Sequence, residues 1–140
     1  LKDIRQLELD KATELFDSHI RQHARPSEES AFDNLSKTAQ RAIDNSSPEF
    51  EAHLDELRGK NVLILWRQDW FVIDRFKRLA QNSYLFPDAR RHAELVGVGI
   101  EALNANDIER LRQIVFQLDS SKIAAADEDE MMVGANIVLG

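Results

Sequence analysis

The chain has no cysteine among its 140 residues, and it has only five glycines and three prolines. Without cysteine it can form no disulfide and no cysteine-ligated metal site, and nothing indicates secretion. So few turn-forming residues disfavour a β fold with many tight turns. No apolar run reaches the ~18 residues that a membrane-spanning helix needs, and no signal-peptide pattern opens the chain. We therefore expect a cytoplasmic protein that does not enter a membrane.

Positive charge is scarce as well. Eighteen Lys and Arg residues stand against 25 Asp and Glu residues, which gives a formal net charge of −7. Such an acidic chain is a poor general binder of nucleic acids or of anionic membranes. The length allows one domain with a real hydrophobic core, and the apolar fraction of 43% is ordinary for a globular protein. Because the first residue is Leu1 rather than Met, we expect a piece of a longer protein.

Helical periodicity runs through most of the sequence. Apolar residues recur every three to five positions in residues 1–24, and Pro26 ends this pattern. Later helices are expected from about 27 to 43, from Pro48 to about Gln81 with a possible defect at Gly59, from Asp88 to Leu103, and from about 107 to 118. Side chains that can cap these helices are Ser27 or Ser30, Ser47, and Asn106 or Asp107.

These patterns predict an all-α fold, a bundle of five to six helices. The helices occupy one domain, residues 1–123. Residues 124–140 lack helical periodicity and form a tail that is first acidic, at Asp127–Glu130, and then apolar.

The block NVLILWRQDWFVIDRFKRLA, residues 61–80, is the most apolar part of the chain and holds both tryptophans. On one continuous helix its apolar side chains cover a little over half of the circumference. This predicts a central tryptophan-rich helix with neighbours on two sides. The polar side of this helical wheel holds Arg67, Gln68, Asp74, Arg75 and Arg78. Ile64 and Phe71 also fall there, where they are either scattered surface residues or a small exposed spot that contacts a partner.

Asp69 lies inside the apolar arc of this block, between Trp66 and Trp70. Three interpretations are open. Asp69 is buried and paired with a basic residue of another helix, or it caps a helix that begins near Trp70, or it is a binding or catalytic acid. The first is favoured, because a buried charge without a partner is too costly.

Other residues with possible chemistry are few. His19 and His23 have the i, i+4 spacing of helical zinc sites, but no third ligand can be identified, and two solvated histidines are the simpler interpretation. Gly97 and Gly99 lie in a helical pattern, which predicts close approach of two helices rather than a phosphate loop. An enzyme that uses Asp69 with a histidine is a disfavoured alternative. We expect no catalytic residue, no cofactor and no metal.

The segments LWRQDWFVIDRFKRLA, LFPD and GIEALNANDIERLRQIVFQL resemble the helical C-terminal region of some bacterial DnaK-type heat-shock chaperone-like proteins. The resemblance covers about residues 60–123 and an acidic tail that ends in NIVLG, while the preceding residues match only in helical character. It implies an upstream ATPase domain and a peptide-binding β domain. This chain would then be a helical module without an ATP site or catalytic residue of its own.

The same resemblance implies a structural or contact role for five residues, Trp66, Arg67, Asp69, Trp70 and Phe71. The tail does not end in the Glu-Glu-Val-Asp type of sequence with which eukaryotic relatives recruit co-chaperones. That class of partner is therefore not expected.

The leading hypothesis is a non-catalytic accessory domain of a DnaK-like chaperone, lid-like or partner-binding. Its partners would be a protein, a peptide or other domains of the same chain. The alternative is a stand-alone helical adaptor or scaffold unrelated to chaperones.

The tail allows two interpretations. In one, its apolar end docks in a groove of its own bundle or of a neighbouring molecule, with the acids toward Arg75, Arg78, Arg90 and Arg91. In the other, the tail has no fixed position.

Overall fold

The computed structural model describes residues 1–123, and every regular element in this range is helical. The six α-helices are α1 (Lys2–Leu15), α2 (Pro26–Asp44), α3 (Phe50–Trp66), α4 (Asp69–Gln81), α5 (Ala89–Asn104) and α6 (Ile108–Ser121). The prediction of an all-α fold with five to six helices is confirmed. No helix in the described range is long and apolar enough to cross a membrane. The predicted tail lies outside the described residues.

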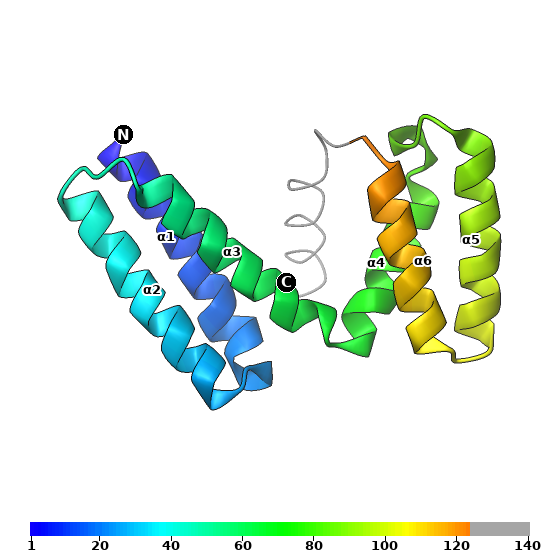
Figure 1. Cartoon of the computed structure of the whole chain (residues 1–140), viewed down its shortest axis with the longest axis horizontal. Coiled ribbons are helices and arrows are strands. Elements are labelled where there is room, and N and C mark those ends of the chain that lie inside the picture. The colour runs from blue at the N-terminus through cyan, green and yellow to red at the C-terminus, as the bar shows by residue number, and fades with distance from the viewer. Residues whose placement is uncertain (124–140) are drawn as a thin grey trace. The chain divides into compact units, whose positions relative to one another are not determined.

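The helices form two compact units, Leu1–Arg67 and Gln68–Gly140, where one domain was expected over residues 1–123. Unit 1 holds α1, α2 and α3 side by side, and unit 2 holds α4, α5 and α6 (Figure 1). Each unit buries apolar side chains of its own. The largest fully buried ones are Phe16, Ile20, Phe32, Ile43, Phe50, Leu57, Ile64 and Leu65 in unit 1, and Val72, Leu79, Leu111 and Leu118 in unit 2.

The expected helix from Pro48 to about Gln81 is interrupted. α3 ends at Trp66, and Gln68 has an extended backbone (φ −89°, ψ 124°) before α4 begins at Asp69. Gly59, where we expected a possible defect, lies inside α3. The two tryptophans therefore stand on different helices, and the single tryptophan-rich helix expected at the centre is not present.

Both units follow the same order of elements. In unit 1, α1 leads through a π turn, η1 (Phe16–Ile20), and a 3-10 turn, η2 (Arg21–His23), into α2. In unit 2, α4 leads through a single 3-10 turn, η3 (Ser83–Leu85), into α5. The sequence shows no repeat of fixed length, so this parallel emerges only from the structure.

The turns after α2 and α5 also share one design. Ser46 and Asn106 adopt left-handed backbones, with φ of 52° and 53°. The amide of Ser46 donates to the carbonyl of Ile43 (3.1 Å), and the amide of Ser47 donates to that of Ala42 (2.8 Å). Asn106 begins the equivalent pair of bonds in unit 2. This Schellman arrangement satisfies the last carbonyl groups of each helix. The chain therefore reverses direction at both turns without a glycine.

Three residues ahead of helices accept hydrogen bonds from backbone amides, and two of them, Ser47 and Asp107, were predicted as capping residues. Asp88 caps α5 and Asp107 caps α6, each through a carboxylate oxygen 3.0 or 3.1 Å from a first-turn nitrogen. The Oγ of Ser47 accepts from the amide of Glu49 (3.2 Å), just ahead of α3.

The start of α2 differs from the prediction. α2 begins at Pro26 itself, so neither Ser27 nor Ser30 is the N-cap residue. The N-cap residue is Arg25, and the carboxylate of Glu28 accepts from its backbone amide (2.8 Å). A proline in the first turn costs no hydrogen bond, because that amide has no partner within the helix.

Close helix approach at the Gly97/Gly99 pair involves only Gly99. Gly99 is buried against the ring of Phe76 in α4, and a Cβ atom added to Gly99 would overlap that ring. Gly97 is exposed, and a Cβ atom there would meet open space. Phe76 itself is 2% exposed, so its ring has little room to move.

Exchange of each glycine for alanine separates these two situations. We expect Gly99→Ala to lower the free energy of unfolding by about 1–3 kcal/mol, because the added methyl group overpacks the α4–α5 contact. Gly97→Ala should raise it by about 0.5–1 kcal/mol, because alanine restricts the unfolded chain at an exposed helical position. Urea denaturation of both variants checks this, and equal effects would contradict the packing role of Gly99.

Candidate protein-binding surface

The five residues singled out from sequence are divided between the units. Trp66 and Arg67 belong to unit 1, and Asp69, Trp70 and Phe71 belong to unit 2. Phe71 is 3% exposed, and the ring of the half-buried Trp70 meets its ring edge-on, with centroids 5.9 Å apart. These residues do not form a polar catalytic constellation within either unit.

The exposed apolar spot suggested by Ile64 and Phe71 is not present. The two side chains are only 2% and 3% exposed. The prediction was wrong because it placed residues 61–80 on one helical wheel. The break at Gln68 restarts the helical phase, so α3 and α4 have separate buried faces.

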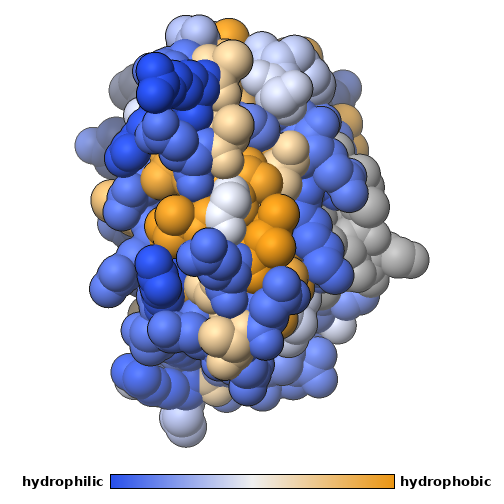
Figure 2. All heavy atoms as spheres, turned by 90° about the vertical axis from the view of Figure 1, so that its right-hand side faces the viewer, coloured by the Kyte–Doolittle hydropathy of each residue, from blue (hydrophilic) through white to orange (hydrophobic). Residues whose placement is uncertain are grey.

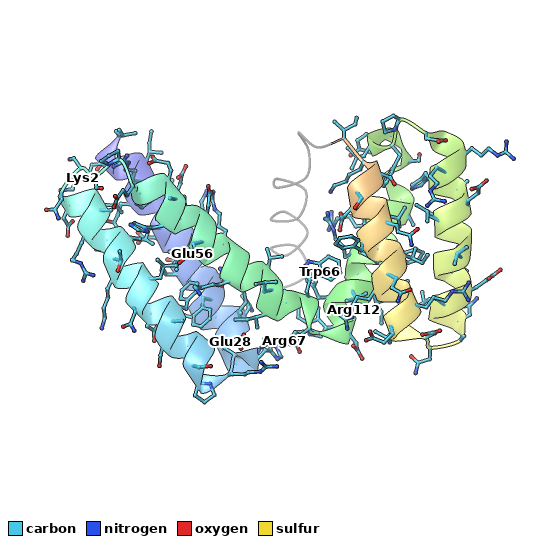
Figure 3. All side chains as sticks on the ribbon, in the orientation of Figure 1. Lys2, Glu28, Glu56, Trp66, Arg67 and Arg112 are labelled. Carbon is cyan, nitrogen blue, oxygen red and sulfur yellow. The ribbon has the colours of Figure 1, made fainter. Side chains whose placement is uncertain are left out.

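Arg67 holds the end of α3 to the start of α2. Its Nη1 and Nη2 atoms donate to the two carboxylate oxygens of Glu28 (2.6 and 2.8 Å), and Nη2 also donates to the carbonyl of His23 (3.2 Å). Figure 3 shows Arg67 and Glu28 at the same end of unit 1. A bidentate pair of this kind fixes orientation as well as distance.

This contact changes the acidity of Glu28. The hydrogen bonds from Arg67, together with the backbone bond at Arg25, lower the pKa of the Glu28 carboxyl from 4.5 to about 2. The same contact raises the pKa of Arg67. The side chains are 28% and 33% exposed, so solvent screens part of the interaction. Arg67 therefore serves the packing of unit 1.

The lowered pKa predicts acid sensitivity of a defined sign. The Glu28 contribution to stability is complete above about pH 5 and is lost as the pH falls toward 2. Glu28→Gln should cost less than about 1 kcal/mol at pH 7 and should reduce the loss of stability between pH 5 and pH 2. Denaturation at several pH values measures both effects.

Glu14→Gln, at an exposed position of α1, is the matched control and should keep the wild-type pH dependence. Some dependence remains in both variants, because Arg21 lowers the pKa of Asp33 in the same way. A Glu28→Gln profile that coincides with wild type would contradict the assigned role.

Asp69 is exposed, although we expected it to be buried. It is the first residue of α4, its side chain is 66% exposed, and its Oδ1 atom accepts from Nη2 of Arg112 (3.3 Å). The N-cap position belongs to Gln68. An acid in the first turn of a helix is favourable near the positive end of the helix dipole, which needs no burial.

The buried charges of unit 2 lie elsewhere. Arg75, which the wheel placed on the polar side, is only 4% exposed, and its Nη2 atom donates to Oδ1 of Asp119 in α6 (2.5 Å). Lys122 follows α6, and its Nζ atom lies 3.6 Å from the same oxygen. Two cations thus contact one carboxylate. No pattern in the sequence predicts this pairing of α4 with α6.

The two acids should respond differently to the same exchange. We expect Asp119→Asn to destabilise the protein by about 3–5 kcal/mol, because it leaves buried cations without the carboxylate they contact. Asp69→Asn removes an exposed pair and should cost less than about 1 kcal/mol. Thermal and urea unfolding of the two variants provide the comparison, and equal losses would disprove this division of roles.

An apolar strip lies along α5. Its members are Val96, Ile100 and Leu103, spaced four and three residues apart, and Ile100 is 47% exposed. Phe76 of α4 packs against Gly99, the residue before Ile100. Val96, Ile100 and Leu103, which we call the α5 face, are half-buried to exposed.

Figure 2 looks onto the side of unit 2 that carries α5 and shows apolar side chains gathered there within a polar surround. No pattern in the sequence distinguishes these side chains from the core of α5. The buried residues His92, Leu95, Gly99 and Ala102 have the same three-to-four spacing. Only the packed helices separate the two stripes.

Unit 1 has a second exposed apolar stripe at the start of α1. Leu1, Ile4 and Leu7 are 83%, 59% and 55% exposed, and they recur every three residues. Ile4 and Leu7 belong to the apolar periodicity that predicts the first helix. The buried residues of α1 are instead Leu9, Ala12 and Leu15.

The histidines give no metal site among the residues that the structure describes. No group of three or more His, Cys, Asp or Glu side chains there is arranged to hold a metal ion. His19 lies in the π turn η1 and His23 in the 3-10 turn η2, so they do not share a regular α-helical face. His92 is buried, with Nε2 2.9 Å from the carbonyl oxygen of Leu79 and its ring against Phe86.

Comparison with known proteins gives no assignment: the chain matches no family model, no curated protein and no solved structure. The DnaK resemblance of residues 60–123 therefore stays a prediction from sequence.

Proposed function

We propose that this chain is a non-catalytic helical module that binds another protein through the α5 face. The observation that carries the proposal is the apolar strip Val96, Ile100 and Leu103, which remains accessible although α5 has already buried its own core stripe. Contiguous exposed apolar surface within a polar rim is typical of protein interaction sites.

The geometry of the strip favours a helical partner segment. Its three α5 positions follow the i, i+4, i+7 pattern and span about two turns, roughly 10 Å. An amphipathic helix presents apolar side chains at the same intervals and can lay them against this face.

The chaperone setting is a separate part of the proposal. It depends on the resemblance of about residues 60–123, a range that contains α4, α5 and α6. In this setting unit 2 would act as a lid-like or partner-binding accessory domain of a DnaK-like protein, with the ATPase upstream. Sequencing the gene upstream of the Leu1 codon tests it: an actin-like ATPase is expected, and a start codon beside Leu1 would refute it.

The α1 stripe favours a second candidate function, an adaptor that joins two partners. Leu1, Ile4 and Leu7 lie in unit 1, and the α5 face lies in unit 2, so each unit offers an apolar surface of its own. An adaptor needs two such surfaces, whereas a simple binding module needs one.

Substitution with lysine tests the binding surface. Partners captured by cross-linking to the wild-type chain are identified, purified and titrated by calorimetry. We expect Ile100→Lys to weaken binding tenfold or more, which corresponds to about 1.4 kcal/mol, because the charge cannot be desolvated in the apolar contact. Asn104→Lys adds the same charge at an exposed position of α5 and should bind like wild type.

The outcome distinguishes the two candidates. If Leu7→Lys loses one partner and Ile100→Lys loses another, the chain is an adaptor. If Ile100→Lys keeps a wild-type circular dichroism spectrum and wild-type affinity for every partner, the α5 face is not the binding surface.

A further inference from the structure

The α5 face continues toward the start of its helix as a longer apolar stripe. Ala89 and Ala93 are exposed and extend the line of the three residues of the face. The five members recur at alternating steps of four and three residues, and we call them the outer stripe: Ala89, Ala93, Val96, Ile100 and Leu103. Alternating steps of four and three are the a and d pattern of a helix that packs along one other helix in a short coiled coil.

The side chains of the outer stripe increase in size along α5. Ala89 and Ala93 carry only a methyl group, whereas Ile100 and Leu103 carry large aliphatic side chains. A well-packed partner helix sets large side chains opposite small ones. α5 itself has this order of side chains when it runs in the opposite direction, so the outer stripe is complementary to its own copy in an antiparallel pair.

We propose that the outer stripe is the interface of an antiparallel homodimer, in which α5 packs against α5 of a second copy of this chain. The inference rests on the proposed function and names the partner of the same face. When Val96 lies level with Ile100 of the copy, Ala93 lies level with Leu103 of the copy. The two-fold axis repeats both pairs, and each pair joins a shorter side chain to a longer one.

The charges beside the outer stripe agree with this register. The end of α5 in the copy, followed by the exposed Asp107, comes beside Ala89 and Arg90. The side chain of Arg90 is 90% exposed, and within its own chain its Nε atom lies 3.4 Å from the carboxylate of Glu94. Arg90 can therefore reach Asp107 of the copy as well, and the axis provides this pairing twice. The arginine and glutamate residues of α5 each fall level with an uncharged residue of the copy, so no like charges oppose each other.

The surface at the centre of the outer stripe leaves room for a second helix. Gly97 lies between Val96 and Ile100 on the outward side of α5, and it is exposed. A Cβ atom added to Gly97 would meet open space. The two-fold axis of the proposed dimer passes close to Gly97, so the two backbones can approach closely where the helices cross.

Sedimentation equilibrium of the full chain, from low micromolar to millimolar concentration, tests the association. We expect the mass of two chains at high concentration and of one chain on dilution. Ile100→Lys should weaken the association tenfold or more, because it brings two like charges to the axis and buries both. Gln113→Lys adds the same charge at an exposed position of α6 and should associate like wild type. Ala93→Lys, also at an exposed position of the stripe, should show the same loss and replaces Ile100→Lys if that variant has an altered circular dichroism spectrum.

Disulfide formation tests the orientation, because the natural chain has no cysteine. A mixture of Ala93→Cys and Leu103→Cys chains should form a disulfide between the two different chains on mild oxidation. Neither variant alone should form one, because the antiparallel register separates the two copies of either position by about 15 Å along the helices. A disulfide in the Ala93→Cys chain alone would indicate a parallel pair and would overturn the proposed register.

The dimer and the proposed function fail in different ways. A chain that stays monomeric at all concentrations, or an Ile100→Lys chain that associates like wild type, overturns the dimer. If the chain is monomeric but Ile100→Lys loses a partner captured by the wild-type chain, the α5 face binds a different protein and only the present inference is wrong. If Ile100→Lys changes neither association nor the binding of any captured partner, both the inference and the proposed function are wrong.

Discussion

The break between α3 and α4 is the constraint on which the burial of residues 61–80 depends. At the end of α3, the hydrogen bonds of Arg67 to Glu28 and to the carbonyl of His23 hold this helix against the start of α2. Directly after it, Gln68 turns to an extended backbone and α4 begins. A single helix through residues 61–80 would have had one continuous buried face. Because of the break, α3 and α4 each have a buried face of their own, and the buried residues of α4 lie on the second of these faces.

The fold class could be read from the sequence because local signals determine it. Asp107 caps α6 as expected, and Ser47 accepts a hydrogen bond from a backbone amide ahead of α3. Scarce glycine and proline disfavoured a turn-rich fold, and proline in the first turn of α2 follows a local rule. The caps and the proline rule each act within about four residues, so the local sequence is enough to predict them.

The break and the charged contacts could not be read in this way. No proline or glycine lies at residues 66–69, and the partner of Arg67 is 39 positions away in the chain. Similarly, Arg75 and Asp119 are separated by 44 positions, and Arg75 looked solvent-facing while Asp69 looked buried. A helical wheel assigns buried and exposed faces correctly only while the helix is continuous. Because the break at Gln68 was not predicted, Arg75 was assigned to the exposed face and Asp69 to the buried face.

The same reasoning explains why the α5 face became visible only in the folded chain. α5 carries two apolar stripes, and both have helical spacing. Gly99 decides between them, because the absence of a side chain lets Phe76 enter and turns one stripe toward the core. Val96, Ile100 and Leu103 are then left at the edge of the α4–α5 contact, half-buried to exposed. These three residues are not needed to complete the core of unit 2, and this exposed apolar surface is the physical basis of the proposal that α5 binds a partner.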